Sequence, residues 1–273
     1  MKDTIFNTIA AAVVFALFPS EASAHGSGND VNLHINPRWS ECSFQLDPSL
    51  TQQAWHQFAK EAGMVSYFRS LTDAKPMGVG HYEFSILQWQ TAFDDRKDAW
   101  NDTFVHPDSV HWLKESARLG FPGLTFRTGI TDNIDVAAFV TKSPGANYGF
   151  WGGQVQYNIV NNVENDWAIS SRLGFNSLYG PEDFNFTVYG LDLLASKEFA
   201  VYSDWITVSP YAGTSIYLAS AHEITSKVTL SDENVAGVQG TIGAVAQISF
   251  AKLAVEYNAA VVNTLSFKIG IGF

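Results

Sequence analysis

Large apolar side chains occupy every second position in the last nine residues of the chain. These positions are Leu265, Phe267, Ile269, Ile271 and Phe273. Because successive side chains of a β-strand point to opposite faces, the five residues share one face of a predicted strand. Serine, lysine and glycine fill the positions between them. The pattern therefore predicts a strand with one wholly apolar face that ends on an aromatic side chain.

Similar alternation recurs from about residue 80 onward and predicts about ten strands, within a range of 8–12. The predicted strands cover residues 80–92, 123–131, 134–142, 148–161, 166–179, 184–197, 205–220, 236–249, 252–261 and 263–273. Most have the length of a tilted strand that crosses a membrane. In 184–197, for example, Leu191 and Leu193 oppose Asp192. A soluble β-sandwich would alternate in the same way but would bury its apolar side.

The closing strand with its terminal Phe273 resembles the last strand of bacterial outer-membrane β-barrels, which typically end in Phe and carry an assembly signal of this type. The layout is also similar to that of uncharacterised, porin-like outer-membrane barrels. The resemblance implies an all-β fold, a transmembrane antiparallel up-and-down β-barrel over residues 80–273. It also implies a location in the outer membrane of a Gram-negative bacterium, surrounded by lipid. The implied partners are the barrel-assembly machinery, bound through the C-terminal strand, and periplasmic chaperones.

The connections between the predicted strands suggest how the barrel is oriented. If the first strand starts in the periplasm, the turns on that side are residues 131–133, 161–164, 198–204 and 251–252. The outside loops are then residues 93–122, 143–147, 180–183, 221–235 and 261–263. The two longest connections, 93–122 and 221–235, both fall outside, where bacterial barrels keep their long loops.

The first 24 residues have the pattern of a secretory signal peptide. Lys2 precedes an apolar run from Ile5 to Phe18, and Ala22-Ser23-Ala24 fits a cleavage site. An uncleaved membrane anchor is the alternative, although the run is short for a spanning helix. Residues 25–79 are then predicted to be a periplasmic segment.

Within that segment, apolar residues near helical spacing predict a helix over about residues 49–71. They are Trp55, Phe58, Ala59, Ala62 and Phe68. Such an amphipathic helix could plug the lumen, pack at the periplasmic mouth or lie on the membrane.

Composition narrows the partners and the chemistry. The formal net charge of −11 argues against nucleic acid as a partner. Cys42 is the only cysteine, so an internal disulfide is excluded and thiolate binding of a metal is disfavoured. Aromatic residues make up 14% of the chain, which fits interfacial girdles, although a large soluble β core would also be aromatic. We expect no cofactor and no metal.

Six charged residues fall on the predicted polar face of the strands: Arg127, Asp135, Arg172, Asp192, Glu256 and Lys268. Hairpins centred near residues 262, 182 and 131 would bring them together as the pairs 256 with 268, 172 with 192, and 127 with 135. One interpretation is that the pairs satisfy one another in a packed lumen. The other is a charged constriction that selects solutes.

Two groups of residues could carry catalysis. Ser220 and His222 share a face at the outer end of a strand, and barrel phospholipases and lipid deacylases use a His–Ser arrangement near the membrane rim. No matching motif surrounds this pair. His106, Asp108 and His111 lie in the predicted loop 93–122, where they could act as in outer-membrane proteases or hold a metal loosely. The local protease motifs are absent, so we assign no catalytic residue.

The sequence therefore predicts an outer-membrane barrel that serves as a passive channel or transporter for small or hydrophobic solutes. The alternative is a structural or adhesive barrel with a filled lumen and functional outer loops. A hydrolase at the rim is a further alternative, which would need His222 or His106.

Overall fold

The computed structural model describes residues 43–94, 97–105, 118–142, 146–202 and 205–273. The long strands are β2 (Tyr82–Ala92), β4 (Arg118–Gly129), β5 (Ile134–Lys142), β6 (Gly149–Asn162), β7 (Trp167–Tyr179), β8 (Phe184–Lys197), β10 (Ile206–Glu223), β11 (Glu233–Ile248), β12 (Ala251–Ala259) and β13 (Thr264–Gly272). The short strands are β1 (Ser43–Phe44), β3 (Phe104–Val105) and β9 (Phe199–Tyr202). The helices are α2 (Gln52–Val65) and α3 (Asp98–Asn101). The predicted signal peptide lies outside the described residues.

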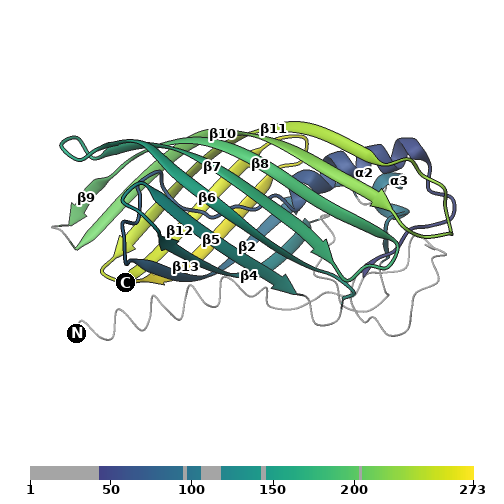
Figure 1. Ribbon diagram of the computed structural model, residues 1–273, viewed down its shortest axis with the longest axis horizontal. Helices are drawn as coiled ribbons and strands as arrows, with labels where there is room; N and C mark the ends of the chain where they lie inside the picture. The colour runs from purple at the N-terminus through teal and green to yellow at the C-terminus, as the bar shows by residue number, and fades with distance from the viewer. Residues whose placement is uncertain (1–42, 95–96, 106–117, 143–145, 203–204) are drawn as a thin grey trace.

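The ten long strands close into one antiparallel barrel (Figure 1). Each long strand pairs with the next one along the chain, and β13 pairs with β2 to complete the wall. The closing register runs from Thr264 opposite Thr91 to Gly272 opposite Glu83. The short β9 adds to one end of β10, while β1 and β3 form a separate pair. The predicted all-β barrel of about ten strands is therefore confirmed.

The wall is apolar outside and polar inside. Trp151 and Leu193 are 50% exposed on the outer surface, whereas Gln154 and Asn158 are buried on the inner one. The outward-facing residues of β13 and of the position that follows it are Leu265, Phe267, Ile269, Ile271 and Phe273, as the alternation predicts. An apolar exterior around a polar interior is the architecture of a transmembrane barrel. Neither helix of the described residues is long and apolar enough to cross a membrane.

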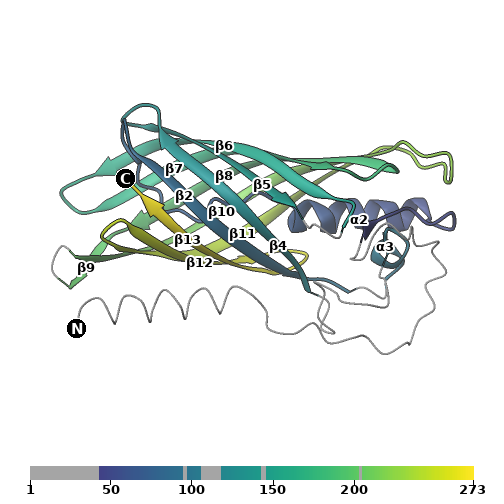
Figure 2. The ribbon, with the colours of Figure 1, turned by 90° about the horizontal axis from the view of Figure 1, so that it is seen from below.

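Most strand boundaries agree with the sequence prediction, and β5 and β8 match it to the residue. The largest difference is at β4, which starts at Arg118 rather than at residue 123. The hairpin of β10 and β11 is also longer than predicted, since its pairing extends to Ala221 opposite Glu233. By contrast, β12 and β13 have only 9 residues each. The rim of the barrel is therefore high on one side and low on the other, as Figure 2 shows.

The two ends of the barrel differ in their connections. We call one the loop end, which carries the connections 93–117, 143–148, 180–183, 224–232 and 260–263. The other is the turn end, which carries the connections 130–133, 163–166, 198–205 and 249–250. The two longest connections, 93–117 and 224–232, thus lie at the same end of the barrel, as the sequence predicts.

Helix α2 lies at the loop end, against β10 and β11 (Figure 1). Its N-cap is Thr51, whose side chain accepts a hydrogen bond from the Ala54 amide. Trp55 and Phe58 are buried on its inner face, while Gln52 on the outer face donates to Glu233 in a 2.5 Å hydrogen bond. The helix therefore fills the mouth of the barrel at the loop end.

The chain leaves α2 at Val65 and continues without helical structure down the barrel to the turn end. We call residues 66–77 the lumen segment. At its far end, Val79 bridges to Gly129, and β2 then starts. The helix was expected to reach residue 71 but ends at Val65. Within the predicted segment 25–79, residues 52–77 lie in the mouth and the lumen of the barrel. Polar side chains on the barrel wall bind the backbone of residues 66–77, which removes the need for helical hydrogen bonds.

Candidate functional site

The first half of the lumen segment, next to α2, is bound by side chains from three strands of the wall. Asn176 donates to the Ser66 carbonyl, and the Tyr67 hydroxyl donates to Asp192. The Lys268 ammonium donates to the Ser70 carbonyl at 3.1 Å. Because these wall residues lie on β7, β8 and β13, the segment is fixed from several sides at once.

The second half of the lumen segment, toward the turn end, is bound in the same way. The Arg172 guanidinium donates to the Thr72 carbonyl at 2.6 Å and to the Asp73 carbonyl at 2.8 Å. Asn158 donates to the Ala74 carbonyl at 2.9 Å. Backbone groups that leave water must find partners inside the protein, and the polar wall provides them.

Arg69 is a buried charged residue of the lumen segment that the sequence analysis missed. Its Nε donates to Asn258 at 2.7 Å, and its terminal nitrogens donate to the Met64 and Tyr67 carbonyls at 2.8 Å. The side chain is buried. It was missed because its neighbours fit a helix with one exposed face, where an arginine would need no partner.

Two of the three predicted pairs of charged residues lie in the predicted register or close to it. Arg127 and Asp135 form a salt bridge of 2.5 Å, although they are diagonal neighbours because Arg127 pairs with Ala137 in the register. Arg172 lies directly opposite Asp192, as predicted. The Arg172 guanidinium nevertheless donates to Gln156 and to the lumen segment, while Asp192 accepts from Tyr67.

The third pair forms with a different partner. Lys268 contacts Glu83 at 2.7 Å rather than Glu256. The β12–β13 register places Glu256 opposite Ser266, so the centre of the hairpin lies one residue earlier than the prediction. Glu256 accepts a hydrogen bond of 2.8 Å from the Tyr211 hydroxyl. The alternation of Glu83 and Ser85 at the start of β2 could have revealed Glu83 as an inward-facing charge.

Glycines on the inner face of the wall make room for tyrosine rings. A Cβ atom at Gly190 would overlap the ring of Tyr67 from the lumen segment, and one at Gly243 would overlap the ring of Tyr211. At these two positions the space exists and a ring fills it.

Little free volume remains between the lumen segment and the wall. A cavity beside Arg69 and Asp192 has a volume of about 10 Å³, and one beside Glu83 and Arg127 has about 20 Å³. One water molecule needs roughly 10–15 Å³. Spaces of this size hold single waters and do not form a path for solutes.

The structure places one of the two predicted catalytic groups. His222 Nδ1 contacts Asp232 at 2.5 Å, and both side chains are more than half exposed. Ser220 lies two positions away on the same strand, and the described residues show no hydrogen bond between it and His222. His106, Asp108 and His111 lie outside the described residues. No group of three metal-binding side chains occurs in the part of the chain that the structure describes.

No protein-family model matches this chain, and no curated protein matches its sequence. The solved structures that are similar to it include the translocator domain of autotransporter NalP from Neisseria meningitidis, with 9% identity, a TM-score of 0.42, and coverage of 84% of this chain and 99% of that one. LpxR from Salmonella typhimurium has 10% identity, a TM-score of 0.37, and coverage of 70% and 99%. The N-terminal β-barrel domain of OprF from Pseudomonas aeruginosa has 12% identity, a TM-score of 0.30, and coverage of 72% and 100%. Similarity in fold alone does not assign an activity.

Proposed function

We propose that this protein is a closed outer-membrane barrel that anchors and displays the surface of its loop end outside the cell. The observation that carries this proposal is the path of the lumen segment, which fills the interior of the barrel from α2 to the turn end. A passive channel needs a water-filled path, and the packed interior favours the filled-lumen alternative over it.

Energetics support a permanently filled interior. Withdrawing the segment would leave the buried side chains of Arg172 and Lys268 without the carbonyls that they bind. Each hydrogen bond to a charged group contributes about 1.5–3 kcal/mol, and leaving a buried charge without partners costs more. Because several such bonds would break together, thermal motion does not open the lumen.

The loop end has the character of a rigid platform. The Phe44 amide donates to Asn147 and the Leu46 amide donates to Asp183, each at 2.9 Å. Beneath them, the Phe44 ring packs edge-on against Phe184 at 5.6 Å. These contacts join the N-terminal part of the chain to two separate loops. A rigid surface of this kind suits recognition of a partner better than gating of a pore.

The first test is electrical conductance of the full-length protein, produced with its predicted leader and reconstituted in a planar bilayer. We expect no current steps from this protein. Heat-modifiable migration on gels shows that the barrels in the preparation are folded, and a general porin in the same apparatus should give steps. Reproducible steps from this protein would contradict the proposal.

A second test addresses orientation. In a Cys42→Ser background, Ser226→Cys places a thiol on the exposed connection 224–232, and Asp132→Cys places one at the turn end. A membrane-impermeant maleimide added to intact cells should label position 226 and spare position 132. The reverse pattern would place the platform in the periplasm and would contradict its display outside the cell.

A further inference from the structure

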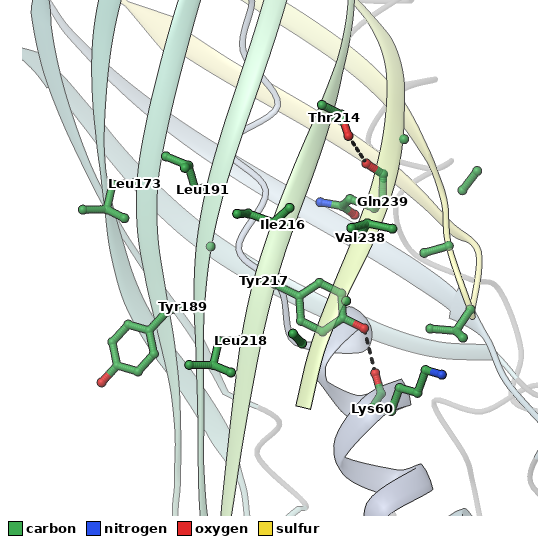
Figure 3. A pocket seen from close by; sticks show the side chains of 17 residues that line it. Lys60, Leu173, Tyr189, Leu191, Thr214, Ile216, Tyr217, Leu218, Val238 and Gln239 are labelled. Atoms are coloured by element: carbon green, nitrogen blue, oxygen red, sulfur yellow. Dashed lines mark hydrogen bonds between the residues drawn. The ribbon is translucent and has the colours of Figure 1, made fainter. Parts of the chain in front are cut away.

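The low side of the rim leaves a notch in the barrel wall. Strand β11 begins at Glu233 but pairs with β12 only from Gly240 onward, so residues 233–239 pair with β10 alone. Beyond Ala259 the chain turns toward β13. Helix α2 lies behind this notch, where the Tyr217 hydroxyl donates to the Lys60 carbonyl at 3.0 Å (Figure 3).

A groove of about 1030 Å³ runs from the notch across the outer face of the wall. Small residues at Ala236, Gly240 and Ala259 form part of its lining, and a Cβ atom at Gly240 would meet nothing within 4 Å. Tyr189 and Leu191 lie along its other side (Figure 3). The groove is therefore a depression in the apolar outer surface, and its lining also includes Tyr217 and Gln239, which face inward.

One charged side chain belongs to the lining of this groove, Lys60 on α2. It is exposed and makes no ion pair within the described residues. The hydrogen bond from Tyr217 fixes the backbone at this position. A cation at one end of an apolar groove matches a ligand that has a hydrocarbon chain and an anionic head group.

We propose that the groove binds an acyl chain of a phosphorylated membrane lipid, with the phosphate beside the Lys60 ammonium. The groove is continuous with the outer apolar surface that faces the bilayer, so lipid chains already adjoin it. Its small residues leave a depth that a flexible chain can occupy. Because α2 lies at the loop end, the lipid comes from the leaflet next to the long loops. This inference does not depend on the closure of the lumen.

The test uses the full-length protein in bilayer nanodiscs that contain phosphatidylglycerol with a photoactivatable group on its acyl chain. After irradiation, peptides from the groove, which include Ala236 and Gly240, should carry most of the cross-linked lipid. Lys60→Glu should lower this labelling about tenfold, since a charged hydrogen bond is replaced by repulsion. Gly240→Trp should lower it by filling the groove. Lys197→Glu at the turn end and Ala212→Trp on the outer face beyond the groove are the matched controls and should leave labelling unchanged.

Three results would overturn the proposal. The first is labelling spread evenly over the outer surface. The second is equal labelling by a diacylglycerol with the same photoactivatable chain, because this lipid has no phosphate for Lys60. The third is a disulfide-linked dimer of Gly240→Cys in the Cys42→Ser background, because it would assign the groove to a second copy of the chain. Heat-modifiable migration of every variant shows that it has folded, and Lys60→Ala serves as a milder change if Lys60→Glu does not fold.

Discussion

Lys268 on the last strand and Glu83 on the first form a buried ion pair of 2.7 Å across the seam that closes the barrel. Lys252 contacts the same carboxylate at 3.2 Å but is more exposed. Removing one partner of a buried pair costs about 3–5 kcal/mol. We therefore expect Lys268→Met to destabilise the barrel by about 3 kcal/mol, near the lower limit because Lys252 remains.

The temperature at which the folded band disappears on semi-native gels measures this loss. Lys252→Met is the matched control and should cost about 1 kcal/mol or less, since its pair is partly solvated. Equal effects of the two substitutions would show that the seam does not depend on the buried pair.

Neutralising the opposed charges Arg172 and Asp192 separates the two functions considered for the barrel. In a filled lumen, Arg172→Gln with Asp192→Asn removes contacts to the lumen segment, so the free energy of unfolding falls and no conductance arises. In a channel, the same change alters ion selectivity. Unfolding in urea and bilayer recordings, made on the same preparation, give the two measurements. Ion currents whose selectivity differs from that of the unchanged protein would support the channel.

The close approach of Tyr67 to Gly190 predicts a strong coupling between the two positions. Gly190→Ala should destabilise the barrel by about 1–3 kcal/mol, because its Cβ atom overlaps the tyrosine ring. In a Tyr67→Ala background the same substitution should cost much less, since the ring is gone. Gly240→Ala, which has open space around it, should stay within about 0.5 kcal/mol of the unchanged protein. Additive effects of Gly190→Ala and Tyr67→Ala would contradict the packing described.

The terminal residue offers a test of the predicted assembly signal. Phe273 exchanges backbone hydrogen bonds with Tyr82 at 3.0 and 2.9 Å, which do not require its side chain. We expect Phe273→Ala to keep its stability once folded but to lower the amount of barrel assembled in cells. The measurement compares heat-modifiable protein in membranes with the yield of refolding in detergent. Val261→Ala removes another exposed apolar side chain and should leave both unchanged.

The strands could be predicted from the sequence because a barrel wall in lipid imposes one rule on every residue. A side chain such as Leu193 must face outward, and its neighbour Asp192 must face inward, so a period of 2 runs through each strand. Register is harder to predict, as Lys268 illustrates. A shift of one residue in the centre of a hairpin changes the partner of a charge, and the local pattern does not define that centre to one residue.

The lumen segment could not be predicted for a different reason. Tyr67 and Phe68 continue the apolar spacing of the preceding helix, so the local pattern favours more helix. The groups that bind this backbone instead, such as Arg172 and Lys268, lie about 100 and 200 residues away in the chain. Only the closed fold brings them together. The notch beyond the end of β12 could not be predicted either, because it arises from the unequal lengths of neighbouring strands.

The path of the lumen segment also has a consequence for how the molecule is made. The segment continues into β2 at one end of the barrel and connects to α2 at the other. If the seam between β2 and β13 closed first, the whole N-terminal portion would have to be threaded through a finished ring. The simplest order of events is that residues 66–77 already lie along the open, curved sheet when its two edges meet. On this route the polar interior is assembled around its own contents and is never empty.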